Sequence, residues 1–178
     1  NPDGDAIGSI LAMQNYLLST NKEVTSFCIT KPSENFNYLQ SIEKIVTNPE
    51  NLADQYDLCI LLDCGDINMS RITDKLKQIQ FKFGIANVDH HYTNPKYGDI
   101  NIVISKASST AEIIYQIMRI SHIKITPAMA TALLTGIVTD TGNFAYRSTT
   151  KQSIETASRL LSIGADFEGI SKANVYNK

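Results

Sequence analysis

Two short apolar runs, each followed directly by an aspartate, are the features that most constrain the fold. Residues 58–62 precede Asp63, and residues 81–88 precede Asp89. A short apolar run that stops at a polar loop is typical of a parallel strand buried on both faces. Helical patterns occupy residues 6–18, 36–46, 69–79, 110–120, 127–138 and 152–161, and further strands are expected at 24–30 and 100–104. The sequence therefore predicts an α/β fold with a mostly parallel sheet flanked by helices.

Size and composition exclude several classes of protein. The chain has 178 residues, of which 43% are hydrophobic, and this suits one well-packed domain. A net charge of -2 argues against a protein that holds duplex DNA by neutralising phosphates. No apolar run approaches the ~18 residues of a membrane span, so no membrane partner is expected. The cysteines are odd in number, with no metal-ligand spacing, and the simplest interpretation is a reducing, cytoplasmic environment.

Several aspartates fall at the ends of predicted elements, where they could converge. Asp63 and Asp89 follow strands, and ligands of open α/β sheets collect beyond the carboxyl ends of the strands. Asp3 and Asp5 lie in a turn that leads into a helix, and Asp140 ends another helix. Carboxylates gathered in a low-dielectric site repel one another unless a cation compensates them. The pattern therefore predicts a bound divalent metal.

The histidine pair that follows Asp89 narrows the choice of metal. Carboxylates with one or two imidazoles and no thiolate suit Mn²⁺, with Mg²⁺, Co²⁺ or Fe²⁺ as alternatives, better than structural zinc. Each feature also has a structural explanation. The segment that contains Asp3 and Asp5 could be a simple turn, Asp63 could cap a loop, and adjacent histidines can occur by accident at a surface. The combination favours the metal site.

Four segments, in order, resemble the motifs of the DHH phosphoesterase superfamily. They are Asn1-Pro2-Asp3-Gly4-Asp5, Leu62-Asp63-Cys64-Gly65-Asp66, Val88-Asp89-His90-His91 and Thr139-Asp140-Thr141-Gly142-Asn143-Phe144. The segments 108–112 and 148–150 are most similar to the branch of nanoRNases (oligoribonucleases) and pAp phosphatases. The resemblance implies a Rossmann-like hydrolase that acts on short oligoribonucleotides or on 3′-phosphoadenosine 5′-phosphate (pAp).

The resemblance also assigns roles to residues of the predicted site. It implies two Mn²⁺ ions, one held by Asp3 and Asp63, the other by Asp5, Asp63, His90 and Asp140. Asp63 bridges the two ions in this scheme, and a hydroxide activated by the metal pair attacks the phosphate. Asp89 orients its histidine neighbours, and His91 faces the substrate phosphate as a catalytic group.

Candidates for substrate contact come from two further segments. Arg147 could pair with a phosphate through two hydrogen bonds, although a surface arginine beside a loop is an equal alternative. Ser108, Ser109 and Thr110 open a helix and could offer hydroxyl and N–H groups to an anion, although helix capping explains them equally well. The expected partner is a short single-stranded RNA or a nucleotide. The sequence leaves the oligomeric state open, a homodimer included.

Other functions remain open at this point. An inorganic pyrophosphatase or a cyclic-dinucleotide phosphodiesterase of the same superfamily would use the same metals. A metal-free nucleotide-binding or scaffold module is the alternative from another class, and the complete set of motif acids argues against it.

The ends of the sequence indicate a piece of a longer protein. We expect a catalytic domain over residues 1–172, truncated at its N-terminus, and the start of a linker at 173–178. The resemblance implies a first strand and a histidine ligand before Asn1, and a smaller C-terminal domain after Lys178.

Overall fold

Three short parallel strands form the sheet that the apolar runs predict. The structure is a computed structural model that describes residues 2–175. The strands are β2 (Cys59–Leu62), β4 (Ile85–Asp89) and β5 (Ile100–Val103), in the order β2-β4-β5. Leu62 lies opposite Val88, so the strands end together and the residues after them meet at one edge. This confirms the predicted parallel sheet.

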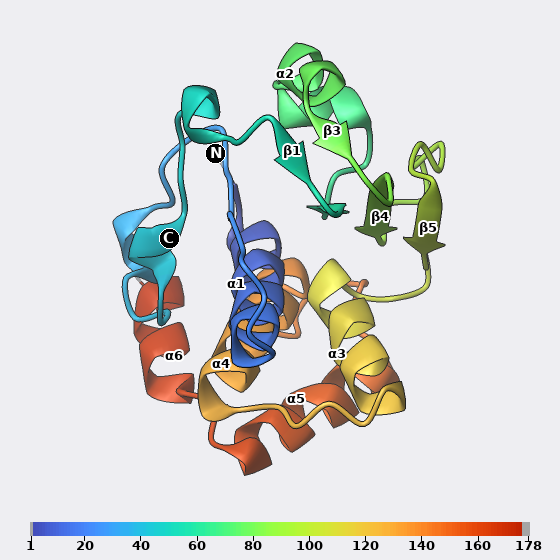
Figure 1. Cartoon of the computed structure of the whole chain (residues 1–178). Helices are drawn as coiled ribbons and strands as arrows, with labels where there is room; N and C mark the ends of the chain where they lie inside the picture. Colours follow the sequence, from blue (N-terminus) through green and yellow to red (C-terminus); the bar gives the residue numbers. More distant parts are fainter. Residues whose placement is uncertain (1, 176–178) are drawn as a thin grey trace.

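A smaller pair of strands extends beside the sheet. β1 (Gln55–Tyr56) and β3 (Gln80–Phe81) are two-residue strands that pair in parallel. A short helix, α2 (Thr73–Gln78), lies on the side of the strands opposite α1 (Gly4–Ser19), as Figure 1 shows. The expected helix at 69–79 is therefore split, because Arg71 at φ 56° ends a 3₁₀ turn (Ile67–Ser70) before α2 begins.

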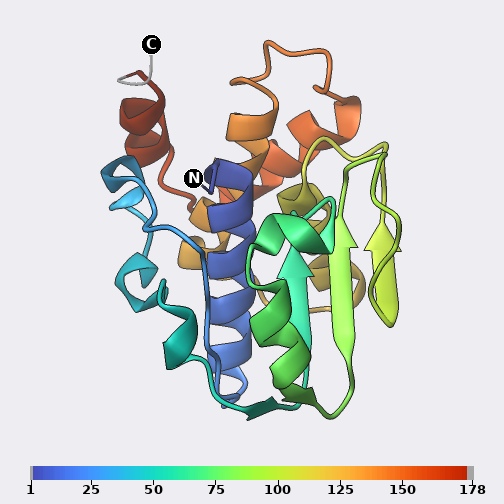
Figure 2. The same cartoon turned by 90° about the horizontal axis from the view of Figure 1, so that it is seen from above.

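Helices cover the other face of the sheet in two layers. α1 and α3 (Thr110–Ile120) lie next to the strands, and α4 (Pro127–Asp140) packs behind them (Figures 1 and 2). Ten successive residues of α4, 129–138, are buried, as expected for a helix enclosed on all sides. α5 (Lys151–Ile163) and α6 (Phe167–Val175) close the far side of α4.

A glycine allows α1 and α4 to approach closely. A Cβ atom added at Gly8 would lie 2.3 Å from the carbonyl oxygen of Ala132, a distance that real side chains do not reach. Ile7 and Leu11 of α1 and Leu133 and Ile137 of α4 are completely buried in the core. This close packing fixes the position of the first turn of α1, where Asp3 and Asp5 lie.

The segment between α1 and β1 differs from the prediction. The strand expected at 24–30 is reduced to one bridge between Phe27 and Val46. The helix expected at 36–46 is replaced by two 3₁₀ turns, Glu34–Phe36 and Ile42–Lys44. Ser41 adopts φ 69° between them, which no continuous helix allows. The apolar side chains there pack against the core from irregular backbone instead.

The C-terminal part of the chain is more helical than predicted. α6 runs to Val175, three residues into the range expected to start a linker, and residues 176–178 of that range lie outside the described part. Ile170 is fully buried and anchors α6, which the sequence analysis missed. In residues 2–175, none of the helices has the length and apolar character needed to cross a membrane.

Candidate active site

The site forms where four elements of the fold end or begin. Asp63 follows β2, and Asp89, His90 and His91 end or follow β4. The first turn of α1 brings Asp5, and the last residue of α4 is Asp140. Asp63 takes φ 55°, a left-handed conformation that turns the chain sharply at the end of its strand.

Asp5 is buried at the N-terminus of α3. Its carboxylate accepts hydrogen bonds from the backbone N–H groups of Thr110 (2.6 Å) and Ala111 (2.9 Å). These bonds and the positive end of the helix dipole support the charged form. Burial, together with the charges of Asp63 and Asp140, outweighs them and raises the pKa of Asp5 well above its usual value. A carboxylate so placed favours a nearby cation.

His90 lies at the centre of the acidic cluster. Its Nε2 atom is 3.1 Å from Asp140 Oδ2, 3.6 Å from Asp63 Oδ1 and 4.0 Å from Asp5 Oδ2. Burial alone would lower the pKa of His90, but the hydrogen bond to Asp140 and the surrounding carboxylates raise it to about 9. In the absence of metal, the imidazolium therefore supplies the positive charge that the carboxylates require.

Asp63 connects the two sides of the cluster. Its Oδ1 atom accepts a hydrogen bond from the Thr110 hydroxyl at 3.1 Å and lies 3.8 Å from His91 Nδ1. Burial, followed by the charge of Asp3, raises the pKa of Asp63 to about 6. Asp3 itself is exposed and caps α1, accepting hydrogen bonds from the N–H groups of Asp5 and Ala6.

Asp89 holds the second histidine in place. Its Oδ1 atom is 2.8 Å from His91 Nδ1, and its Oδ2 atom accepts a 2.6 Å hydrogen bond from the Asn94 side chain. Asp89 is fully buried. Burial alone would raise its pKa, but the hydrogen bonds from Asn94 and His91 lower it below the usual value. Asp89 thus stays charged and fixes the orientation of His91.

The donor atoms of the cluster fit a divalent cation. Two groups of three residues, Asp63 with His90 and His91, and Asp5 with His90 and Asp140, place their ligand atoms within 4.8 Å of one another. Oxygen and imidazole ligands without thiolate suit Mn²⁺ and similar ions. Cys64 is nearby, but its thiol donates to the Asp66 carbonyl, and burial raises its pKa, so it remains protonated.

The comparison with known families shows which family the chain belongs to. Residues 1–137 match the N-terminal domain of the DHH family. The chain belongs to the DHH family. The DHH sequence of the family name is Asp89-His90-His91 here, and the match covers three of the four motifs.

The relatives of this DHH domain confirm the predicted branch. The chain is 32% identical to the bifunctional oligoribonuclease and PAP phosphatase NrnA of Thermus thermophilus over 164 residues, which are 92% of this chain and 48% of the relative. It is 29% identical to NrnA of Bacillus subtilis, over 90% of this chain and 50% of the relative. The chain thus spans about half the length of the curated relatives it matches.

A solved structure confirms the fold of the DHH domain. It is that of an exopolyphosphatase-related protein from Bacteroides fragilis, superposed with a TM-score of 0.89 at 26% identity. The superposition covers 99% of this chain and 54% of the other. The α/β architecture with parallel strands is therefore shared by this chain and that structure.

The predicted substrate contacts of the DHH domain lie in different surroundings. Arg147 is exposed and lines a cavity together with His90 and His91. Ser108 lines the same cavity, but its hydroxyl donates to the buried Glu112 carboxylate at 2.6 Å. The Ser109 hydroxyl caps α3, and the Thr110 hydroxyl bonds to Asp63, so both serve the interior of the protein. The capping alternative therefore accounts for Ser109.

An asparagine network below the site was missed from the sequence. The Asn94 amide donates to Asp89, to the Cys64 carbonyl and to Asn87 Oδ1, and the Asn87 amide donates to Asn94 and Asn101. Asn87 is fully buried within β4. A buried amide needs hydrogen-bond partners, so this asparagine in an apolar strand was the available signal.

Proposed function

We propose that this DHH domain is the catalytic part of a metal-dependent phosphoesterase that hydrolyses short oligoribonucleotides and removes the 3′-phosphate of pAp. The observation that carries the proposal is the meeting of Asp5, Asp63, His90 and Asp140 at one edge of the sheet. The two NrnA relatives, named as oligoribonucleases and PAP phosphatases, support the choice of substrate. Packing alone would not gather these acidic side chains at one edge of the sheet, because like charges placed together away from water are unfavourable.

The resemblance to the DHH motifs supports the following roles for the acidic residues. Asp3 and Asp63 would hold one Mn²⁺ ion, and Asp5, Asp63, His90 and Asp140 would hold a second. Bound there, such ions lower the pKa of water and neutralise charge on the oxygens of the phosphate. The chain positions these ligands through the N–H groups of Thr110 and Ala111, which fix the Asp5 carboxylate. The Thr110 hydroxyl does the same for Asp63.

Asp89 would orient His91, and His91 would interact with the reacting phosphate. A proton on His91 Nδ1 is held by the charged Asp89 carboxylate. This tautomer leaves Nε2 of His91 as the nitrogen available to the substrate. The ring is part of the wall of the cavity that Arg147 also lines. In its imidazolium form, with a second proton on Nε2, His91 would stabilise the phosphate or protonate the leaving oxygen.

The test is a comparison of substrates with the full-length protein. We expect Mn²⁺-dependent release of mononucleotides from a diribonucleotide and of phosphate from pAp, and loss of both in EDTA. Pyrophosphate and a cyclic dinucleotide should be hydrolysed far more slowly. Asp63→Asn should reduce hydrolysis at least about 10³-fold, whereas Asp57→Asn, which changes an exposed acid before β2, should not.

The result also separates the alternatives. Faster hydrolysis of pyrophosphate or of a cyclic dinucleotide would replace the proposed substrate class with one of the related activities. No hydrolysis of any substrate, together with an Asp63→Asn variant that behaves like the wild type in metal binding, would instead indicate a scaffold module.

A further inference from the structure

The cavity beside the two histidines has an unusual lining for a site next to so many acids. It measures about 360 Å³ and contains no carboxylate among the residues that line it. They are His90, His91, Tyr92, Ser105, Lys106, Ala107, Ser108, Arg147, Ser148 and Thr150. The lining therefore combines hydroxyl-bearing residues with cationic side chains, and the carboxylates of the acidic cluster are not part of it. Such a lining favours an anion.

Two cations of this cavity come from separate segments of the chain. Lys106 lies in the loop before α3, and Arg147 lies in the loop between α4 and α5. Within residues 2–175, the structure gives neither side chain an ion pair or a hydrogen bond. Both are exposed, so their charges are available to a ligand in the cavity. A phosphate dianion matches this arrangement in charge and in hydrogen-bonding capacity.

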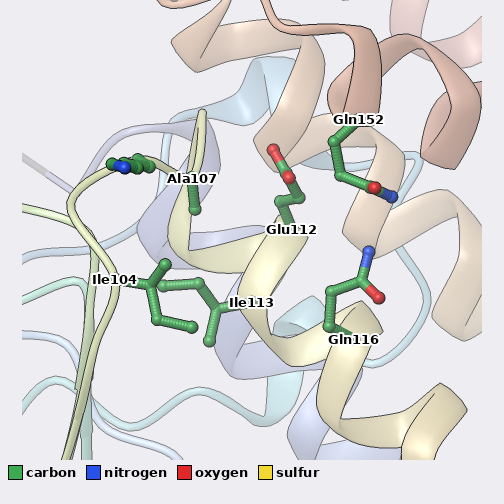
Figure 3. Close-up of a pocket in the computed structure, with 7 residues that line it drawn as sticks. Ile104, Ala107, Glu112, Ile113, Gln116 and Gln152 are labelled. Atoms are coloured by element: carbon green, nitrogen blue, oxygen red, sulfur yellow. The ribbon is translucent and has the colours of Figure 1, made fainter.

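A second cavity of about 260 Å³ adjoins the same loop and shares the lining residues Lys106 and Ala107 with the first. Figure 3 shows Ile104 and Ile113 on one side of this cavity and the amide groups of Gln116 and Gln152 on the other. Ile104, Ala107 and Ile113 give it apolar walls, and the carboxylate of Glu112 makes it unfavourable for a phosphate. Apolar walls with a few amide groups suit a nucleobase.

We propose that these two cavities form a nucleotide subsite: Lys106 and Arg147 hold a second phosphate of the substrate, and the neighbouring apolar cavity takes its base. The inference rests on the proposed function, since it places the reacting phosphate at the acidic cluster. It specifies the substrate class as nucleotides that carry a phosphate besides the one that reacts. For pAp, that second group is the 5′-phosphate, which remains on the product.

Binding of the reaction product tests the subsite without any turnover. 5′-AMP keeps the second phosphate and the base, whereas adenosine lacks the phosphate and ribose 5-phosphate lacks the base. By isothermal titration calorimetry with the full-length protein, we expect 5′-AMP to bind at least about tenfold more tightly than either fragment. Equal affinities for 5′-AMP and adenosine, or no measurable binding of 5′-AMP, would overturn the proposal.

Variants separate the two halves of the subsite. Lys106→Met should weaken the binding of 5′-AMP and ribose 5-phosphate at least about tenfold and leave adenosine unchanged. Gln116→Leu should weaken 5′-AMP and adenosine several-fold and leave ribose 5-phosphate unchanged. Lys124→Met is the matched control, because Lys124 is an exposed lysine beyond the opposite end of α3. A Lys106→Met variant that binds all three ligands like the control would contradict the assignment.

Kinetics distinguish this inference from the proposed function. pAp and 3′-AMP carry the same reacting phosphate and differ only in the 5′-phosphate. We expect Lys106→Met to lower kcat/KM for pAp at least about tenfold, mainly through KM, and to leave 3′-AMP within about twofold. Equal losses of kcat/KM on pAp and 3′-AMP would contradict the proposed subsite but not the proposed hydrolase. If no substrate is hydrolysed but 5′-AMP still binds more tightly than adenosine and ribose 5-phosphate, the proposed hydrolase is contradicted and the subsite is not.

Discussion

Replacing Asp63 by asparagine should stabilise the metal-free protein, although it disables the site. Asp63 is buried beside Asp3 and Asp140, and these surroundings raise its pKa to about 6 from its usual value of 3.8. Asparagine has nearly the same shape and can still accept the hydrogen bond from the Thr110 hydroxyl. The variant therefore removes an unfavourable charge while keeping the packing of the folded protein.

The size of the effect follows from the pKa of Asp63. Its rise from 3.8 to about 6 corresponds to about 3 kcal/mol at ~1.36 kcal/mol per unit. The figure already contains the favourable interaction with His90, which lowers the pKa of Asp63, and it is an upper bound because asparagine leaves a buried polar group in place of the carboxylate. A gain of about 2 kcal/mol in the free energy of unfolding at pH 7 is therefore expected.

The dependence on pH has a defined sign. Because the folded protein holds the Asp63 proton more tightly than the unfolded chain, ionisation of this group destabilises the fold as pH rises from about 4 to about 6. Below pH 4 the carboxyl group is protonated in both states, and the wild type and the variant should be equally stable. Above pH 6 the difference should reach its full size and remain constant until His90 titrates.

Urea denaturation in EDTA, followed by circular dichroism between pH 4 and pH 8, measures this difference. Asp57→Asn is the control, since Asp57 is 80% exposed and its change should alter the free energy of unfolding by less than about 0.5 kcal/mol. Saturating Mn²⁺ should reverse the order, because only the wild type binds the metal tightly. A variant less stable than the wild type in EDTA at pH 7, or a difference that does not change with pH, would refute the electrostatic argument.

Three further substitutions test the supports of the site and the core. Asn94→Ala removes a hydrogen bond to the charged Asp89. It should lower kcat on a diribonucleotide at least about tenfold and the free energy of unfolding by about 1–3 kcal/mol. An unchanged kcat would show that the asparagine network is not required. Gly136→Ala places a Cβ 2.6 Å from Asp5 Oδ1 and should weaken Mn²⁺ binding in a metal titration, whereas wild-type affinity would mean that the helices adjust freely. Leu134→Ala, in the buried centre of α4, should cost about 2–5 kcal/mol in urea denaturation; a cost below 1 kcal/mol would contradict the packing described.

The sheet and the site could be predicted because local sequence signals agree there with the tertiary structure. The run before Asp63 is apolar on both faces and becomes β2, and the helix expected at 110–120 has the bounds of α3. Parallel strands that end together bring the residues after them to one edge, so the meeting of Asp63 and His90 follows from topology.

The segments that were not predicted depend on contacts between distant parts of the chain. Residues 36–46 have helical spacing, but the positive φ of Ser41 and packing against the core divide them into short turns. α6 has only nine residues, too few for a stable helix on its own, and it is anchored by the burial of Ile170. The support of Asp5 by the N-terminus of α3 joins residues more than 100 positions apart. Periodicity within a short window contains no information about such contacts.

The proposed function depends most on a cation held by the carboxylates and His90. The most direct measurement is a crystal structure of the Mn²⁺-soaked protein, with anomalous scattering recorded at the manganese absorption edge. We expect anomalous density within coordination distance of Asp5, Asp63, His90 and Asp140, as the proposed function requires. Manganese found only at surface acids, with the side chains at the edge of the sheet unchanged and in direct contact with one another, would contradict it.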